Sequence, residues 1–303
     1  MALINEGRPF RSIDAAACGL NRRQFAEARH AGALFPIFRG VVVDSRSADS
    51  RELRIEAASL VVPPNAVVAD HTAAWLYGAD TLPPGDMREL RPMFLVPHST
   101  SRPFSAAGTV RQTTIPDPDV VHIGGLQVTS PLRTAADLLR RCWRPYALAA
   151  GDALARAKVV SSEEVAEYVL RLRKQRGVIQ ARELAQVIDS KAASHGESWM
   201  RCRMLDAGLP RPELDFEIHD HWGNQWRLDS AYATQRMASE YDGRGDHTGP
   251  EAIEHDEGRR STIEQRLSWK FVIATRERIF GAEDSFEHEL GKALSVPIRQ
   301  RRW

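Results

Sequence analysis

Two short runs near the C-terminal end, QWRLDSAY and RMASEYD, constrain the fold of this chain more than any other feature. Each run alternates the character of its side chains with a period of two, which predicts a strand with one face in a core. A tight turn at residues 234–235 would join the two strands and pair residues whose numbers sum to 469. In that register Asp229 lies directly opposite Glu240, with Cβ atoms about 4.5–5.5 Å apart.

Two carboxylates at this separation destabilise a sheet unless a cation lies between them or one of them is protonated. A divalent ion resolves the repulsion, so the sequence predicts that Asp229 and Glu240 bind Mg²⁺ or Mn²⁺. Such an ion lowers the pKa of a bound water and stabilises the charge that develops during phosphodiester hydrolysis. The alternative is a register slipped by one residue, which puts the two carboxylates on opposite faces.

Three further side chains extend this acidic group. Asp242 shares a face with Glu240 because it lies two residues further along the strand. Glu197 lies on the helical stripe that faces the sheet, although the spacing from Ser194 also predicts a capping box in which the glutamate only reaches back to an amide. His247 lies in the following glycine-rich loop and is either an inert loop residue or a general acid, water ligand or phosphate contact.

The two strands belong to a longer pattern that occupies residues 191–303. A helix beginning near residue 194 is followed by three strands, a helix from about 250 to 267, a strand and a closing helix. We therefore expect a C-terminal α+β domain with the element order α-β-β-β-α-β-α.

Residues 1–60 predict a different domain, in the order helix, turn, helix and strand. The second helix begins after the candidate N-cap Asn21 and carries Arg22 and Arg23 in its first turn. In a winged helix-turn-helix this end of the recognition helix contacts base edges, so Asn21, Arg22 and Arg23 are candidate DNA-binding residues, while Arg39 on the wing contacts phosphate. The alternative is a small helical domain with ordinary solvated arginines.

The middle region, residues 61–190, predicts an α+β linking domain in which Pro-rich connections separate helices and short strands. The sequence between residues 140 and 182 has ten Arg or Lys residues against four carboxylates. This excess fits either a solvated helix face or a track for the DNA backbone, and the sequence does not decide between them.

Composition restricts the class of protein. A length of 303 residues predicts two or three domains, and a net charge of +1 requires any nucleic-acid surface to be local. The chain has 36 arginines and five lysines, which fits either phosphate recognition or the codon bias of a GC-rich genome. Three distant cysteines and the lack of a signal peptide or an 18-residue apolar run predict a cytoplasmic protein without a membrane partner.

The C-terminal segments GESWMRCRMLDAGLPRPELDFEI, WRLDSAY, MASEYDG and HDEGRRSTIEQRLSWKFVIATRERI resemble the very-short-patch-repair (Vsr)-like endonuclease domain of actinobacterial proteins. That domain belongs to the PD-(D/E)XK nuclease superfamily, so the resemblance implies a PD-(D/E)XK-like fold. It implies that Glu197 matches the acidic residue of the first helix and Asp229 the metal-binding aspartate. Glu240 and Asp242 match an E-x-D pair in place of the E-x-K of the superfamily, and His247 matches a histidine that often follows.

The upstream segment GLNRRQFAEARHAGALFPIFRGVVVD resembles the winged-helix part of AbiEi-type antitoxins of type IV toxin-antitoxin systems. DHTAAWLYG and VTSPLRTAADLL are similar to the helical and linking region that follows it. The resemblance implies double-stranded DNA as a partner and leaves open a partner toxin.

Together these features predict a multidomain α+β protein in which a winged helix positions a Vsr-like domain for divalent-metal-dependent DNA cleavage. The catalytic candidates are Asp229, Glu240, Asp242, His247 and Glu197. The alternative is a transcriptional repressor or antitoxin whose nuclease fold is inactive and binds DNA, which the missing lysine of the E-x-K motif favours. A third hypothesis is a protein-interaction module that neutralises a partner encoded nearby.

Overall fold

The computed structural model describes residues 3–82, 91–98, 108–243, 250–301 and 303. The chain divides into two compact units, each made of two separate segments. Unit 1 comprises Met1–Arg141 and Ala157–Gln186, and unit 2 comprises Cys142–Arg156 and Val187–Trp303. The chain therefore passes from one unit to the other three times. The expected three-domain division, with boundaries near residues 60 and 190, stays a prediction.

The N-terminal part of unit 1 is a three-stranded antiparallel sheet with one α-helix. Its elements are β1 (Phe10–Arg11), the 3₁₀ helix η2 (Ser12–Asp14), α1 (Arg22–His30), β2 (Leu34–Phe38) and β3 (Val41–Asp44). The strand order is β1-β3-β2, and β2 and β3 form a hairpin that turns at Arg39 and Gly40. Gly40 has a φ of 80°, a conformation that glycine adopts without strain.

The rest of unit 1 combines a five-stranded mixed sheet with helices. The strands are β4 (Val67–Val68), β5 (Met93–Val96), β6 (Thr109–Gln112), β7 (Val120–Ile123) and β8 (Leu126–Thr129), in the order β6-β5-β4-β8-β7. The helices are α2 (Arg51–Ser59), α3 (Asp70–Leu76), α4 (Pro131–Arg141), α6 (Ser162–Arg171) and α7 (Val178–Ala185). The short 3₁₀ helices η1 (Ile4–Gly7) and η3 (Asp117–Asp119) complete the unit.

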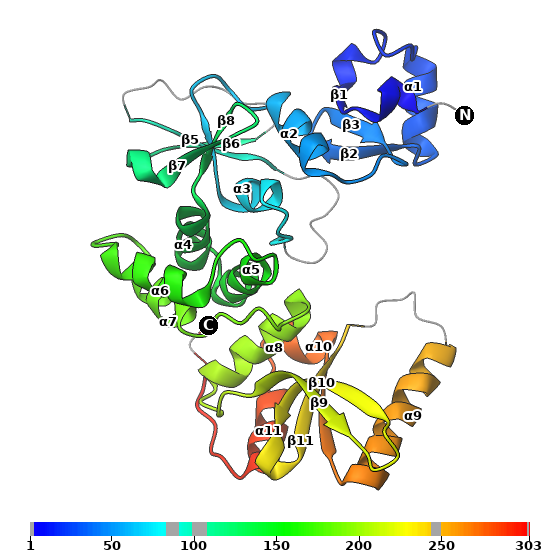
Figure 1. Cartoon of the computed structure of the whole chain (residues 1–303), viewed down its shortest axis with the longest axis vertical. Helices are drawn as coiled ribbons and strands as arrows, with labels where there is room; N and C mark the ends of the chain where they lie inside the picture. Colours follow the sequence, from blue (N-terminus) through cyan, green and yellow to red (C-terminus); the bar gives the residue numbers. More distant parts are fainter. Residues whose placement is uncertain (1–2, 83–90, 99–107, 244–249, 302) are drawn as a thin grey trace. The chain divides into compact units, whose positions relative to one another are not determined.

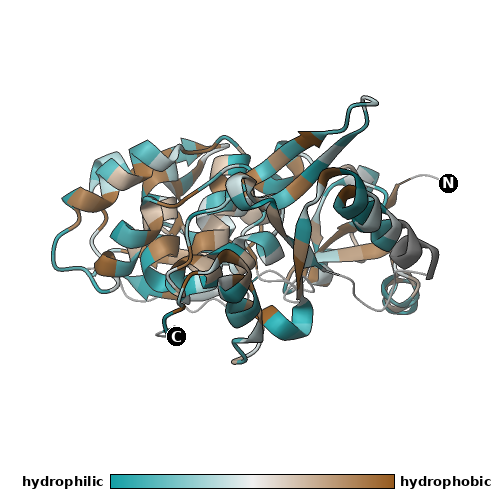
Figure 2. Cartoon of the chain, turned by 90° about the horizontal axis from the view of Figure 1, so that it is seen from below, coloured by the Kyte–Doolittle hydropathy of each residue, from teal (hydrophilic) through white to brown (hydrophobic). Residues whose placement is uncertain are grey.

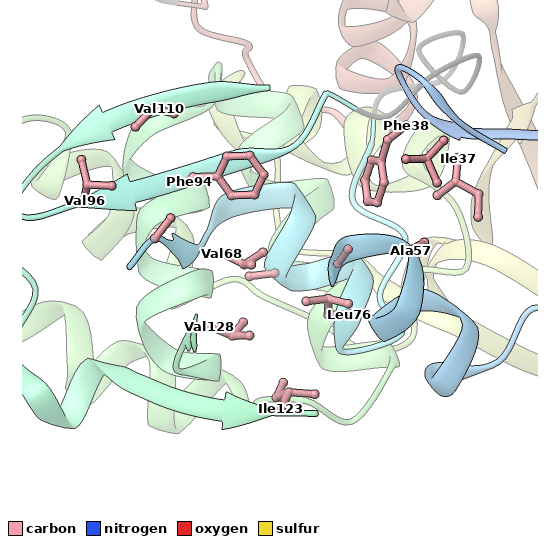
Figure 3. Packing of buried hydrophobic residues seen from close by; sticks show 14 of the residues in the cluster. Ile37, Phe38, Ala57, Val68, Leu76, Phe94, Val96, Val110, Ile123 and Val128 are labelled. Atoms are coloured by element: carbon pink, nitrogen blue, oxygen red, sulfur yellow. The ribbon is translucent and has the colours of Figure 1, made fainter. Parts of the chain in front are cut away.

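One hydrophobic core joins the N-terminal strands to the middle sheet of unit 1. Ile37 and Phe38 of β2 pack in the same cluster as Leu76 of α3 and Phe94 of β5, as Figure 3 shows. The ring of Phe38 also meets Trp75 edge-on at a centroid distance of 5.3 Å. Because these side chains are buried together, the β2–β3 hairpin is fixed to the middle sheet by apolar packing.

Unit 2 has the element order expected from the sequence, with two additional α-helices and the short 3₁₀ helix η4 (Ala233–Gln235) between β10 and β11. Its elements are α5 (Arg144–Arg156), α8 (His195–Asp206), β9 (Glu213–His219), β10 (Gln225–Tyr232), β11 (Met237–Asp242), α9 (Pro250–Leu267), β12 (Lys270–Thr275), α10 (Arg276–Ile279) and α11 (Ser285–Leu294). The sheet order is β12-β11-β10-β9, with β11 and β12 parallel and the other pairs antiparallel. The α-β-β-β-α-β-α order is therefore confirmed, and α5 and α10 are extra elements.

The sheet of unit 2 is covered on both faces (Figure 1). On one face Met237 and Ala274 pack with side chains of α8 and α11, including Trp199 and Phe286. On the other face strand residues such as Leu228 pack against Ile263 of α9 and against the residues beside it. Strand β11 and the end of β10 are therefore covered on both faces, whereas β9 and the start of β10 keep exposed residues such as Arg227.

Two arginines of α8 are buried in unit 2 with carboxylate partners. Arg201 contacts Asp152 of α5 at 2.6 Å, and Arg203 contacts Glu287 of α11 at 2.7 Å. All four side chains are 0% exposed. These pairs link helices that are distant in sequence, and α5 belongs to unit 2 partly for this reason.

The elements of both units alternate hydrophilic and hydrophobic residues, as Figure 2 shows. Because both units contain helices and sheets, the chain is a multidomain protein of mixed α+β class, as expected. Within the described part of the chain, no helix is both long and apolar enough to span a membrane. The winged-helix and PD-(D/E)XK assignments stay predictions.

Candidate functional site

The first candidate site is the exposed face of α1. The helix begins with a capping box, in which Asn21 Oδ1 accepts from the Gln24 amide and Gln24 Oε1 accepts from the Asn21 amide, both at 2.9 Å. Phe25 and Ala28 pack on the small core of the N-terminal sheet. The cap and these two contacts fix the start and the rotation of the helix. They leave the side of α1 that carries its arginines in solvent.

The predicted arginines are all exposed. Arg22 and Arg23 lie in the first turn of α1, and Arg39 lies at the turn of the β2–β3 hairpin. Arg23 contacts Glu27 at 2.8 Å, but with side chains 88% and 60% exposed this pair holds the arginine weakly. A fourth arginine, Arg29, is also exposed. It lies on the same helical face as Arg22, because the two residues are seven positions apart. The Asn21 oxygen already caps the helix, and its expected contact with DNA stays a prediction.

The second candidate site is the carboxylate group between α8, β10 and β11. Strands β10 and β11 pair Ser230 with Ser239, Ala231 with Ala238 and Tyr232 with Met237. This is the expected register, in which paired numbers sum to 469. The register slipped by one residue is therefore excluded for these pairs, which end at Ser230 and Ser239, one residue short of Asp229 and Glu240.

Asp229 is half-buried, and its environment disfavours the charged form. Burial raises the pKa of Asp229 to about 7, and the negative charges of Glu197 and Glu240 add to the rise. The Tyr241 amide opposes this effect by donating to Asp229 Oδ2 at 2.9 Å, and Arg259 opposes it by its positive charge. The environment of Asp229 therefore favours its protonated form, which is one of the two resolutions expected for a close carboxylate pair.

Glu240 is 5% exposed and is neutralised by arginines of α9. Arg259 Nη2 donates to Glu240 Oε1 at 2.5 Å, and Arg260 Nη1 lies 3.6 Å from Glu240 Oε2. Arg259 also donates to the Arg227 carbonyl oxygen at 3.3 Å, which ties α9 to β10. The cation that the paired carboxylates require is thus supplied by the protein itself.

Glu197 makes the capping contacts and also contributes charge to the cluster. Its two carboxylate oxygens accept from the Ala193 amide at 2.8 Å and from the Ser194 hydroxyl at 2.9 Å. Burial raises the pKa of the Glu197 carboxyl. The preceding Gly196 explains how the helix comes so close to the sheet, because a Cβ there would lie 1.9 Å from the ring of Tyr241.

The remaining two predicted residues are less closely tied to this group. Asp242 is half-buried at the end of β11, paired in register with Thr275 of β12. His247 lies outside the described residues. The proposed catalytic roles of Asp229, Glu240, Asp242, His247 and Glu197 stay predictions.

The fit of a divalent ion is limited by the arginines. Carboxylate oxygens are suitable ligands for Mg²⁺ or Mn²⁺. However, Arg259 and Arg260 already contact both oxygens of Glu240, so an ion there would have to displace a guanidinium. In the described part of the chain, no group of three or more His, Cys, Asp or Glu side chains is arranged to hold a metal. The expected Mg²⁺ or Mn²⁺ site stays a prediction.

Sequence reasoning missed the role of Arg259 and Arg260. The two arginines follow Gly258 in the middle of a predicted helix, where they read as ordinary solvated side chains. The signal available in the sequence was the carboxylate pair itself, which requires a cation of some kind. A guanidinium from the neighbouring helix meets this requirement as well as a metal does.

Comparisons with known proteins identify relatives over most of the chain. The AbiEi antitoxin C-terminal domain matches residues 65–187. The uncharacterized protein MT2308 of Mycobacterium tuberculosis (strain CDC 1551 / Oshkosh) is 34% identical over 219 residues, which cover 72% of this chain and 78% of the relative. The uncharacterized protein Rv2248 of strain ATCC 25618 / H37Rv gives the same figures.

A comparison with solved structures found similarity at a low level. The crystal structure of the RV2827C protein from Mycobacterium tuberculosis has a TM-score of 0.31 and 13% sequence identity, over 70% of this chain and 83% of that chain. A likeness this loose supports no conclusion about fold or function.

Proposed function

Because the chain belongs to the family of the mycobacterial proteins MT2308 and Rv2248 and matches the AbiEi antitoxin C-terminal domain, we propose that it is a DNA-binding regulator of the antitoxin type. The N-terminal sheet and α1 act as a winged helix, in which α1 enters the major groove of double-stranded DNA. The proposal places function in binding and assigns no covalent chemistry to the protein.

The observation that carries this proposal is the exposed arginine face of α1. Arg22 and Arg23 lie at the N-terminal end of a capped helix, and nothing among the described residues covers them except the exposed Glu27. Arginine presents a planar set of donors that matches the acceptors of guanine in the major groove. Arg39 on the hairpin turn is a suitable phosphate contact.

Binding of duplex DNA by the full chain tests the proposal. A site would be selected from a random duplex pool, and its affinity would then be measured by fluorescence anisotropy at several salt concentrations. We expect the Arg22→Ala/Arg23→Ala variant to lose about tenfold to a hundredfold in affinity, since each base-edge contact contributes about 1–3 kcal/mol. Arg39→Ala should weaken binding less and lower the slope of log K against log salt by about 1.

The matched control is Arg211→Ala in unit 2. Arg211 is also an exposed arginine in contact with a carboxylate, Asp189 at 3.3 Å. The Arg211→Ala variant should bind DNA with the same affinity as the wild type. Equal affinities of the wild type and the Arg22→Ala/Arg23→Ala variant would contradict the assignment of α1 as the recognition helix.

A second candidate function is the divalent-metal-dependent DNA endonuclease predicted from the sequence. The observation in its favour is the carboxylate group of unit 2, in which the negative charges of Glu197 and Glu240 help to raise the pKa of Asp229. If an ion binds there, Asp229 and Glu240 would hold it and it would supply activation of water. Calorimetric titration of Mn²⁺ and a nicking assay on supercoiled DNA would test this, with Asp229→Ala/Glu240→Ala as the variant. Mn²⁺ uptake and nicking that both disappear in the variant would establish a nuclease and overturn the non-enzymatic proposal.

The match to an antitoxin domain also supports a protein partner for residues 65–187. We propose that this region binds a toxin encoded beside the gene for this chain. Gel filtration of the chain with the products of the adjacent genes would show a complex if this is correct. Separate elution of every candidate would contradict it.

A further inference from the structure

A cavity of about 410 Å³ lies within unit 1, beside the hairpin that carries Arg39. Its walls come from β2, from β3 and the segment after it, from α2, and from α3 with the residues that follow it. Pockets that bind small molecules have volumes of about 300–1,000 Å³, with mostly apolar walls and a few polar groups. The size of this cavity therefore suits a compact organic molecule.

Two aromatic side chains contribute to the apolar part of the cavity. Trp75 is held in place by the edge-on contact with Phe38 and by the Arg54 guanidinium, which lies 5.3 Å from its ring centroid. Phe35 is 51% exposed although it is a large hydrophobic residue. A flat ring bound in the cavity would bury both aromatic surfaces, and such contacts contribute beyond simple area burial.

The charges around the cavity favour a cation. Three aspartates line it, but Asp44 is paired with Arg46 at 2.6 Å and Asp49 with Arg54 at 2.5 Å. Among the residues that the structure describes, Asp80 has no arginine or lysine within 4.0 Å, and it is exposed. Its carboxylate accepts only a 3.3 Å contact from the amide of Leu82 in that set, so it can pair with an incoming positive charge.

A polar edge completes the cavity. His71 of α3 and Thr81 both line it, and His71 Nδ1 lies 2.9 Å from Thr81 Oγ1. This contact orients the imidazole and joins the end of α3 to the segment that carries Asp80. The contact between His71 and Thr81 therefore helps to hold Asp80, which precedes Thr81, at the wall of the cavity.

We propose that this cavity binds a small aromatic cation, a planar ring that carries an amine or amidine group. The ring packs on Trp75 and Phe35, and the cationic group pairs with Asp80. This is a ligand site distinct from the DNA-binding face of α1 and from the carboxylate group of unit 2.

Occupation of the cavity affects the hairpin through one short chain of contacts. Trp75 contacts Phe38, and Phe38 precedes Arg39 at the hairpin turn. A ligand that reorients Trp75 or Phe35 therefore acts on the strand that presents Arg39, so its binding is coupled to the affinity for DNA. This second step depends on the proposed DNA-binding function, whereas the ligand site itself does not.

The test uses three probes with one ring system and different charges. Tryptamine is a cation, indole is neutral and indole-3-acetate is an anion, and the affinity of each for the full chain would be measured by isothermal titration. We expect tryptamine to bind about fivefold more tightly than indole, and indole-3-acetate to bind most weakly. Asp80→Asn should reduce the affinity for tryptamine to that for indole. Lack of saturable binding of tryptamine at millimolar concentration would overturn the proposal.

Two variants separate the aromatic and ionic parts. Phe35→Ser changes an exposed ring, so the fold should be kept, and it should weaken all three probes by a similar factor. Asp117→Asn removes an equally exposed aspartate away from the cavity and should change none of the affinities. Discrimination by charge that survives in Asp80→Asn would show that the ionic assignment is wrong.

Anisotropy measurements with DNA test the coupling. With tryptamine at saturation, we expect the affinity for the selected duplex to change at least threefold in the wild type and to stay constant in Asp80→Asn. An unchanged affinity in the wild type would overturn the coupling. If the chain binds no DNA with or without tryptamine, the DNA-binding function is wrong while the titration still decides the ligand site.

Discussion

The arginines of α1 and those of α8 show two opposite uses of one residue type. On α1, Arg22 and Arg23 are exposed, and Glu27, which pairs with Arg23, is exposed as well. On α8, Arg201 and Arg203 are 0% exposed and each is paired with a buried carboxylate. The abundance of arginine in the composition thus says little about nucleic-acid binding until each side chain is placed. Exposed arginines are available to a partner, whereas buried arginines hold the fold together.

The carboxylate group of unit 2 lies between these extremes. The Arg259 side chain is 25% exposed, and it neutralises a glutamate whose side chain is 6% exposed. The Arg259 guanidinium is part of the fold, yet it pairs with Glu240, which was expected to bind a metal ion. Four substitutions test the difference between charges that hold the fold together and charges that are available to a partner.

The largest effect is expected when a buried pair is broken. Asp152→Ala leaves the Arg201 guanidinium buried without its carboxylate and should destabilise unit 2 by about 3–5 kcal/mol. Chemical denaturation followed by circular dichroism would measure the loss. Glu289→Ala removes a half-exposed carboxylate in contact with Arg278 and should cost less than about 1 kcal/mol. Similar losses in both variants would contradict the distinction between buried and exposed arginines.

The next largest effect concerns the pH dependence of stability. The pKa of Asp229 is raised to about 7, so the folded state binds more protons than the unfolded state between about pH 4 and pH 7. The free energy of unfolding contributed by this residue therefore falls as the pH rises through that window, by up to about 4 kcal/mol. Asp229→Asn should remove this fall and should be more stable than the wild type at pH 8. Parallel pH profiles of the two proteins from pH 4 to pH 8 would show that Asp229 is ionised in the fold throughout.

A smaller loss of stability is expected when the arginine that pairs with Glu240 is removed. Arg259→Ala leaves Glu240 with only the more distant Arg260 and should destabilise unit 2 by about 2 kcal/mol. Adding Glu240→Gln should recover part of the loss, because the uncompensated charge is removed. Arg227→Ala, at an exposed pair with Asp215, is the matched control and should cost at most about 1 kcal/mol. No recovery in the double variant would show that Arg259 acts through packing alone.

The smallest effect concerns the helix cap that presents the exposed arginines. Asn21→Ala removes the acceptor for the Gln24 amide and should cost about 1 kcal/mol of stability. It should also weaken DNA binding, because the first turn of α1 carries Arg22. Ser50→Ala removes the comparable cap of α2, which accepts from the Leu53 amide at 3.1 Å. It should cost a similar amount of stability without changing the affinity for DNA.

Much of the local structure could be predicted because it depends on neighbours in sequence. The register of β10 and β11 followed from the length of the turn between them, and the start of α1 followed from Asn21. Neither requires knowledge of distant residues.

The features that sequence reasoning missed depend on long-range packing. The short strands β4, β6 and β7 have two to four residues each, too few to show a period. Arg259 meets Glu240 only because α9 packs across the sheet, and no spacing along the chain encodes that contact. The raised pKa of Asp229 likewise depends on burial, which the alternation of residues did not reveal.

The repeated passage of the chain between the two units has a consequence for its synthesis on the ribosome. Helix α5 emerges early, but Asp152 finds its partner only after Arg201, 49 residues later, has been made. Until then Asp152 of α5, which is buried in the folded protein, lacks its arginine partner. Unit 1 is also incomplete until α7 has emerged, so the two units mature in overlapping rather than successive intervals. A single proteolytic cut, or the exchange of one contiguous gene segment, cannot separate them cleanly.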